Sequence, residues 1–206
     1  MKIIDISPLL SPRTAVWPGD VPFSRSVCMS TDEGDSMTLS STTSTVHLGA
    51  HVDAPNHYQA GASGIAARDL EMYYGSCQVL KVQIARGARV RVADVTTPIT
   101  APRVLIHTGS FPDSENWNSD FNALSAELVD FLHSKGVVLV GIDTPSIDLQ
   151  EDKQLQSHQA VARHDMAILE GVVLTDVKVG TYTLCALPLR LENADASPVR
   201  AVLLTE

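Results

Sequence analysis

Four side chains that commonly bind metal ions or move protons lie close together in this sequence. His47, His51, Asp53 and His57 alternate with small residues in the stretch HLGAHVDAPNHY, although the whole chain has only 7 histidines. Imidazole nitrogens and a carboxylate, without a thiolate, suit Zn²⁺ or a similar divalent ion. His47, His51 and Asp53 would supply three such ligands, which leaves coordination positions open, as in catalytic zinc sites. The stretch therefore predicts a catalytic metal site.

The spacing of these ligands requires the chain to curl. In a straight strand His47 and His51 would lie about 13 Å apart. A single ion cannot bridge that gap, because zinc–nitrogen bonds are about 2.0–2.1 Å long. Gly49 permits the backbone angles that a bend needs, and Pro55 fixes a second bend before His57. We therefore expect a tight turn between the first two histidines.

A second group of candidate ligands lies much later, in SHQAVARHDMAILEG. On one straight helix His158 and Glu170 would be about 18 Å apart, so they can meet at one ion only if the chain turns back between them. Spacing alone leaves open whether either residue is a ligand. His164 and Asp165 fit a solvated helix surface equally well.

Short apolar runs rich in β-branched residues predict the strands that must position these groups. The runs cover residues 2–6, 78–84, 103–107, 137–143, 183–188 and 199–204. Helices are predicted over 122–136 and 158–169, and a polar surface loop over 111–120. The pattern predicts a single α/β domain over residues 1–206 in which strands outnumber helices.

Composition argues against several classes of protein. The chain carries 15 basic and 24 acidic residues, a formal net charge of −9, and no run of lysines and arginines, which argues against nucleic-acid binding. No signal peptide and no apolar stretch of membrane-spanning length are recognised. Cys28, Cys77 and Cys185 are scattered and form no C-x-x-C pair, so a reducing, cytoplasmic location is expected. No G-x-S-x-G elbow indicates a serine hydrolase.

The motifs resemble those of a known family. HLGAHVDAPNHY is similar to the H-x-G-[TA]-H-x-D-x-P-x-H signature of the cyclase-like metal-dependent hydrolases, and more narrowly of the bacterial kynurenine formamidases, or arylformamidases. The segments WPGDVPF, GIDTPSID, SHQAVARHDMAILEG and LPLRLENADASPVRAVL agree in the same order, so the resemblance covers essentially the whole chain. The Trp-Pro-Gly-Asp segment and Ala50, where relatives often have threonine, point to the formamidase branch.

The resemblance implies a fold and a set of ligands. The fold is a swivelling β/β/α arrangement with a mixed sheet, assembled as a homodimer. One zinc ion would be bound by His47, His51 and Asp53, and a second by Asp53, His158 and Glu170. Asp53 and Glu170 would be shared between two ions per subunit, and other divalent metals are compatible with the same ligands.

The resemblance also implies a reaction. N-formyl-L-kynurenine would be hydrolysed to L-kynurenine and formate, with a metal-bound hydroxide attacking the formyl carbonyl. His57 would act as proton donor and acceptor, a role that suits an imidazole. Trp17 would contact the aromatic ring of the substrate. The expected partner is therefore a small molecule, with neither nucleic acid nor membrane involved.

Two alternatives stay open at this point. A relative that hydrolyses another small amide or lactam, such as isatin, would use the same ligands with a different aromatic pocket. A metal-binding protein without turnover is the alternative from another class. His107 and His133 are expected to be ordinary structural residues, and Asp143 and Thr144 to form either a wall of the site or part of the scaffold.

Overall fold

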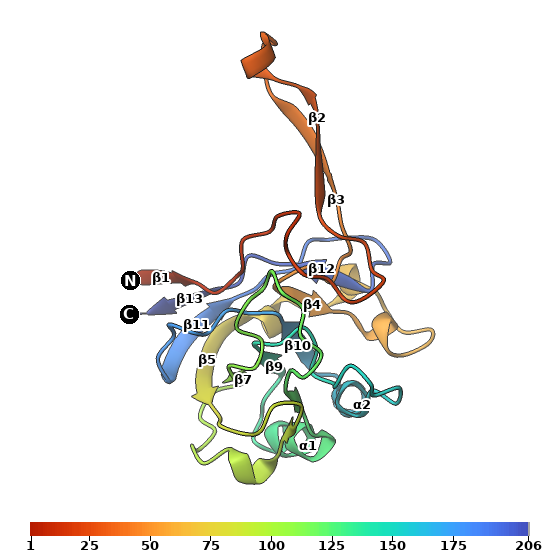
Figure 1. Ribbon diagram of the computed structural model, residues 1–206. Helices are drawn as coiled ribbons and strands as arrows, with labels where there is room; N and C mark the ends of the chain where they lie inside the picture. The colour runs from red at the N-terminus through yellow and green to blue at the C-terminus, as the bar shows by residue number, and fades with distance from the viewer. Residues whose placement is uncertain (206) are drawn as a thin grey trace.

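The computed structural model describes residues 1–205, and its largest feature is a mixed sheet of nine strands (Figure 1). In chain order these strands are β1 (Lys2–Asp5), β4 (His51–Asp53), β5 (Tyr74–Lys81), β7 (Arg103–His107), β9 (Leu139–Ile142), β10 (Ala167–Glu170), β11 (Gly180–Cys185), β12 (Ala196–Pro198) and β13 (Val202–Thr205). Across the sheet they follow the order β1-β13-β11-β5-β7-β9-β10-β4-β12. Strands β5, β7, β9 and β10 are parallel neighbours, and the other pairs are antiparallel.

Two helices cover one face of this sheet. α1 (Ala126–Ser134) and α2 (Gln156–Arg163) lie together at the lower side of Figure 1. Val104 and Ile106 of β7 pack into the core that contains these helices, whereas Leu105 packs into the core on the opposite face. Strands that are covered on both faces read as continuous apolar runs, as these do. Within residues 1–205 neither helix is long and apolar enough to cross a membrane.

The four parallel strands end at the same edge of the sheet. Lys81 is the last residue of β5, His107 of β7 and Glu170 of β10, and Asp143 directly follows β9. Crevices at the carboxyl ends of parallel strands are common binding sites in α/β proteins. The fold therefore gathers four polar side chains at one edge.

The remaining strands form two small sheets. β6 (Arg89–Val90) pairs with β8 (Ala123–Leu124). β2 (Ser24–Met29) and β3 (Leu39–Thr43) form an antiparallel hairpin that projects far from the rest of the molecule (Figure 1). We call residues 24–43 the β2–β3 arm. The short 3₁₀ segments are Thr31–Glu33, Pro55–His57, Ile65–Ala67, Leu70–Tyr73 and Val92–Asp94.

The structure confirms the α/β class with a mixed sheet and places a strand at each of the six predicted runs. The predicted helix over 122–136 is confirmed as α1 over Ala126–Ser134, but its predicted start is wrong, because Ala123–Leu124 form β8. The predicted helix over 158–169 is wrong in its second half, because α2 ends at Arg163 and residues 167–170 form β10. The chain reverses at Asp165, whose φ is 49°, and β10 pairs with both β9 and β4. Sheet pairing therefore overrides the local helical pattern.

Candidate active site

The segment that begins at His47 curls as its spacing requires. Gly49 adopts a φ of 59°, and the ring centroids of His47 and His51 come within 5.0 Å of each other. A Cβ atom at Gly49 would lie 2.6 Å from Cδ2 of Leu10, so the turn has no room for a side chain. β4 then carries His51 and Asp53 straight into the sheet.

The five predicted ligands meet at one place. Asp53 Oδ1 lies 3.2 Å from His47 Nδ1 and 3.5 Å from His51 Nε2, while Asp53 Oδ2 lies 3.3 Å from His158 Nε2. Glu170 Oε2 is 3.2 Å from His51 Nε2, and Glu170 Oε1 is 3.7 Å from His158 Nε2. We call these five residues the His/Asp/Glu centre. Each carboxylate therefore faces at least one histidine from the first segment and also His158 from the second.

The reversal between α2 and β10 brings the second part of the centre into place. His158 lies in α2, and after the turn at Asp165 the chain runs back as β10 to Glu170. β10 pairs with β4 so that Glu170 is opposite His51. The pairing explains how residues that are distant in sequence share one centre.

The centre fits a divalent cation. His51 Nε2 and both carboxylate oxygens of Asp53 are buried and have no hydrogen-bond partner among the described residues. Burying such polar atoms without a partner is costly, and a bound cation would satisfy all three. The donors are nitrogens and oxygens without sulfur, a set that suits Zn²⁺ and other divalent ions of its kind.

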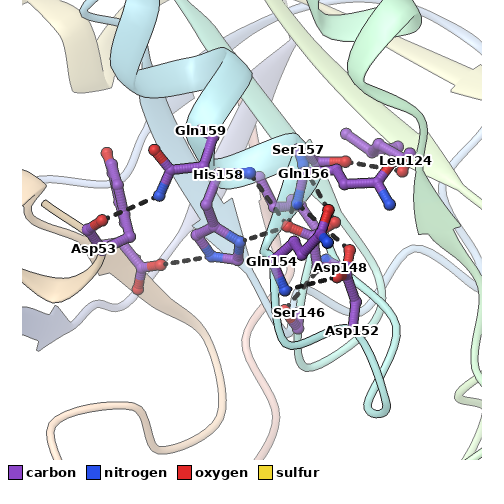
Figure 2. Close-up of polar contacts among 12 residues, drawn as sticks. Asp53, Leu124, Ser146, Asp148, Asp152, Gln154, Gln156, Ser157, His158 and Gln159 are labelled. Carbon is purple, nitrogen blue, oxygen red and sulfur yellow. Dashed lines mark hydrogen bonds and ion pairs between the residues drawn. The ribbon is translucent and has the colours of Figure 1, made fainter.

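Hydrogen bonds fix the orientation of the two most buried imidazoles. His158 donates from Nδ1 to Asp148 Oδ2 over 2.8 Å, which aims its Nε2 at Asp53 (Figure 2). His51 likewise donates from Nδ1 to the carbonyl oxygen of Gly49 over 2.9 Å. Partners of this kind are typical of metal-binding histidines, where they set the tautomer and the orientation of the ring.

Asp148 is the hub of the network behind His158 (Figure 2). It accepts hydrogen bonds from the backbone nitrogens of Ser157 and His158, and Arg89 Nη1 donates to it over 2.6 Å. Burial raises the pKa of Asp148, but the hydrogen bonds from His158 and Arg89 outweigh burial and hold the pKa well below its usual range. Asp148 therefore stays ionised. The sequence interpretation left this residue unassigned, although GIDTPSID contains it.

His57 stands beside the centre at the end of the 3₁₀ segment Pro55–His57. Its ring centroid is 4.2 Å from that of His47 and 6.0 Å from that of His158. Burial lowers the pKa of His57, so the ring is neutral at pH 7 and has a free nitrogen for a proton. One of its nitrogens also lies within 4.8 Å of Asp53 and His158 ligand atoms, so geometry alone allows it to join them as a ligand.

Asp195 is a further acidic residue at this place that the sequence interpretation missed. Its Oδ2 lies 3.0 Å from His47 Nε2 and 3.5 Å from His57 Nδ1. β12 pairs with β4 so that Ala196 is opposite Asp53, which brings Asp195 over the histidine segment. The only signal in the sequence is the matching segment LENADASP, which shows agreement without showing a role.

A cavity of about 720 Å³ opens onto the centre. Its lining includes His57, His158 and Glu170 together with Trp17, Phe111 and Trp117. The rings of Trp17 and Trp117 pack edge to face with centroids 5.3 Å apart, and those of Phe111 and Trp117 with centroids 5.7 Å apart. Residues 111–120 form no helix or strand, as expected, but this loop also supplies two of the three rings.

The other histidines divide into two groups. His133 and His164 stack with ring centroids 4.0 Å apart, and His164 Nε2 lies 2.7 Å from Asp130 Oδ1, so both have local partners outside the centre. His107 lies elsewhere: it lines the cavity, and its Nε2 lies 3.7 Å from Asp143 Oδ2.

Solved structures of metal-dependent hydrolases share this architecture. A "potential metal-dependent hydrolase with cyclase activity" aligns with a TM-score of 0.85 over 98% of this chain and 96% of its own, at 24% identity. A "predicted metal-dependent hydrolase" from Bacillus stearothermophilus gives 0.81 over 98% and 97%, at 23% identity. Isatin hydrolase A from Labrenzia aggregata, bound to benzyl benzoate, gives 0.80 over 100% and 94%, at 20% identity. The fold is therefore that of the cyclase-like metal-dependent hydrolases.

Sequence similarity identifies the family. The chain belongs to the Cyclase family, whose model, described as "Putative cyclase", matches residues 4–149. The matched range contains the whole segment from His47 to His57, whereas His158 and Glu170 lie beyond it.

Proposed function

We propose that this protein is an arylformamidase, which hydrolyses N-formyl-L-kynurenine to L-kynurenine and formate. One observation carries the proposal: the same cavity is lined by the neutral His57, by His158 and Glu170 of the His/Asp/Glu centre, and by aromatic rings. Hydrolysis of an aryl formamide needs a group that moves a proton, a centre that activates the carbonyl, and a surface that binds the ring. Its ring would lie against an aromatic wall while its carbonyl reaches the centre.

The proposed cofactor is Zn²⁺, with two ions per chain. His47, His51 and Asp53 would hold one ion, and Asp53, His158 and Glu170 the other. When bound, such ions polarise a carbonyl and allow water to ionise near neutral pH. The unpartnered buried atoms of His51 and Asp53 support this placement.

His57 would move the proton that the reaction transfers. The leaving nitrogen is a poor base because its lone pair is delocalised into the ring, so it must be protonated as the C–N bond breaks. The neutral imidazole can accept a proton from the attacking water and donate it to this nitrogen, so that a neutral aryl amine departs. Asp195 Oδ2, 3.5 Å from His57 Nδ1, is placed to steady the ring in both protonation states.

Trp17 would provide the face on which the aryl group rests. It lines the cavity and is 37% exposed, so part of the residue remains accessible. The backbone nitrogen of Asp20 donates to the carbonyl oxygen of Trp17 over 2.9 Å, which closes a turn around Pro18 and holds the ring at the cavity. An indole in such a loop suits stacking on an arene.

Isatin hydrolysis is the second candidate. Its support is the likeness to isatin hydrolases, one of which aligns over 100% of this chain with a TM-score of 0.80. Isatin also presents an aryl amide carbonyl, so the same residues would serve both reactions. A binding protein without turnover is the third possibility, and the open cavity beside a neutral His57 argues against it.

The two substrates separate these candidates. Purified protein should release formate from N-formyl-L-kynurenine with a kcat/KM well above its value for opening the isatin ring. The His57→Ala variant is the control for contaminating activity and should be strongly impaired with both compounds. A higher kcat/KM for isatin would replace the first proposal by the second, and activity with neither compound would refute both.

We also propose that two copies of the chain associate through the β2–β3 arm. Val27, Met37 and Leu39 on this arm are 49%, 55% and 50% exposed. A lone two-stranded hairpin is marginal in water, so a second copy covering the arm would stabilise it. Sedimentation should give a dimer, and Val27→Ser with Leu39→Ser should weaken it. A wild-type monomer would contradict this proposal.

The cytoplasmic location stays a prediction.

A further inference from the structure

The cavity continues from the centre along the carboxyl ends of the parallel strands. Lys81 and His107 both line it, and they are paired in register on β5 and β7. Glu170 ends β10, two strands beyond β7 and three beyond β5. At about 4.8 Å per strand, His107 is about 10 Å and Lys81 about 14 Å from Glu170 across the sheet. These two residues therefore lie at the end of the cavity remote from the centre.

Lys81 is unusual in its surroundings. It is the only lysine or arginine among the described residues that line the cavity, in a chain whose formal net charge is −9. No carboxylate lies within 4.0 Å of its ammonium group in the part of the chain that the structure describes. Its charge is thus available to an anionic group that enters the cavity.

His107 provides a second, independent group. The residue is only 7% exposed, yet its ring makes no hydrogen bond to the residues that the structure describes. Its ring nitrogens are not among the fully buried unpartnered atoms of the described residues, and the ring lines the cavity, so a nitrogen remains accessible to a group that enters. Burial lowers the pKa of His107, so the neutral ring has one N–H to donate.

We propose that Lys81 and His107 form a subsite for the carboxylate of an amino-acid substrate, at the end remote from the amide that is cleaved. The inference rests on the proposed function and deepens it, because N-formyl-L-kynurenine carries its carboxylate on an acyl chain beside the formamide. A lysine and an N–H donor together recognise a carboxylate through charge-assisted hydrogen bonds. Isatin has no carboxylate and would not use this subsite.

Asp143 lies beside the subsite, but its carboxylate already has hydrogen-bond partners within the protein. It accepts hydrogen bonds from Thr108 N, Thr108 Oγ1 and Gly109 N, at distances between 2.7 and 3.0 Å. These donors offset its charge and hold the loop that follows His107. Asp143 is therefore assigned to positioning rather than to the substrate.

Replacement of Lys81 tests the subsite. For Lys81→Met we expect KM for N-formyl-L-kynurenine to rise about 10- to 100-fold, because a hydrogen bond to a charged group is lost, with kcat changed by less than about twofold. Kinetics with formanilide, an aryl formamide without a carboxylate, should not change. Lys135→Met, at the exposed C-terminal end of α1, is the matched control and should match the wild type on both substrates.

Equal losses on both substrates, or no loss on either, would overturn the subsite. Product binding separates this result from a failure of the proposed function. L-kynurenine should quench the tryptophan fluorescence of the wild type at lower concentration than 2-aminoacetophenone, which lacks the carboxylate, and Lys81→Met should remove that difference. If the wild type hydrolyses neither formamide, the proposed reaction is wrong, and these binding curves still decide the subsite. Identical wild-type affinities for the two compounds would refute it.

Discussion

The two halves of the His/Asp/Glu centre reach the same place by different routes. The first half, His47, His51 and Asp53, comes from a single curled segment. The second half, His158 and Glu170, comes from a helix and a strand that are joined by a reversal of the chain. The side chain of His47 is 19% exposed, whereas that of His158 is 2% exposed.

The halves also differ in what holds them. The first half depends on backbone geometry, since the turn at Gly49 both bends the segment and supplies the carbonyl that orients His51. The second half depends on side chains, since the ionised Asp148 and its partner Arg89 orient His158. Local backbone changes should therefore disturb the first half, and loss of buried charge the second.

The largest effect is expected at His57, which belongs to neither half. His57→Ala should lower kcat about 10²–10⁴-fold, because a group that both accepts and donates the proton is lost. Metal content should stay at the wild-type value by elemental analysis. Loss of metal in this variant would instead make His57 a ligand, as its closeness to Asp53 and His158 permits.

Removal of one histidine from each half tests whether the halves hold separate ions. His47→Ala and His158→Ala should each reduce the metal content from about two ions to about one per chain, because each removes a ligand of one ion only. Activity should fall severely in both variants. Elemental analysis after gel filtration measures the content. If either single variant loses both ions together, the two halves form one indivisible site.

Replacing the carboxylates that support each half should have a smaller effect, on metal affinity, and one that differs between the halves. Asp148→Asn should weaken metal binding in the second half about 10- to 100-fold, as is typical when a carboxylate behind a histidine ligand is lost. Asp195→Asn is the matched change for the first half and should have a smaller effect, because the side chain of Asp195 is 48% exposed. Titration against a chelator measures both. Equal effects would show that burial does not distinguish the two supports.

The pKa values of the two halves predict a release of protons. Burial lowers the pKa of His47 and of His158, but neighbouring carboxylates outweigh it and raise the values to about 9 and about 10. Without metal both rings are therefore charged at pH 7, and the stability that their ion pairs contribute is full below the ordinary pKa of 6.5 and is lost as the pH rises from there through 9 to 10. Metal binds neutral imidazole, so it should release about two protons at pH 7 and bind more tightly as the pH rises. Calorimetry in buffers of different ionisation enthalpy measures this release, and none would contradict the charged state.

The smallest effect is expected for backbone change in the first half. Gly49→Ala should destabilise the protein by about 1–3 kcal/mol, because alanine is strained at positive φ and its Cβ atom would press on Leu10. Gly61→Ala is the control, since Gly61 also has a positive φ, 77°, but nothing within 4 Å of the place that a Cβ atom would occupy. Chemical denaturation gives both values. Equal losses would show that crowding at the turn contributes nothing.

The first half could be predicted from the sequence because its information is local. His47, His51 and Asp53 lie close together, and simple distances already required the turn that Gly49 makes. Apolar runs likewise predicted the strands of the sheet, because burial on both faces leaves a continuous pattern.

The second half and its surroundings could not be predicted from local patterns. Residues 167–169 read as the end of a helix, and only pairing with two other strands makes them part of β10. The β2–β3 arm, rich in serine and threonine, is exposed on both sides and therefore lacks the alternation that marks a half-buried strand. Asp148, Asp195 and Lys81 matter through neighbours that are distant in sequence, which spacing does not show.

One measurement tests the central claim most directly: formate release from N-formyl-L-kynurenine before chelation, after chelation, and after Zn²⁺ is restored. The account predicts activity in the untreated protein, its loss when the ions are removed, and its return when about two Zn²⁺ per chain are bound again. Full activity in protein shown to contain no metal would contradict it.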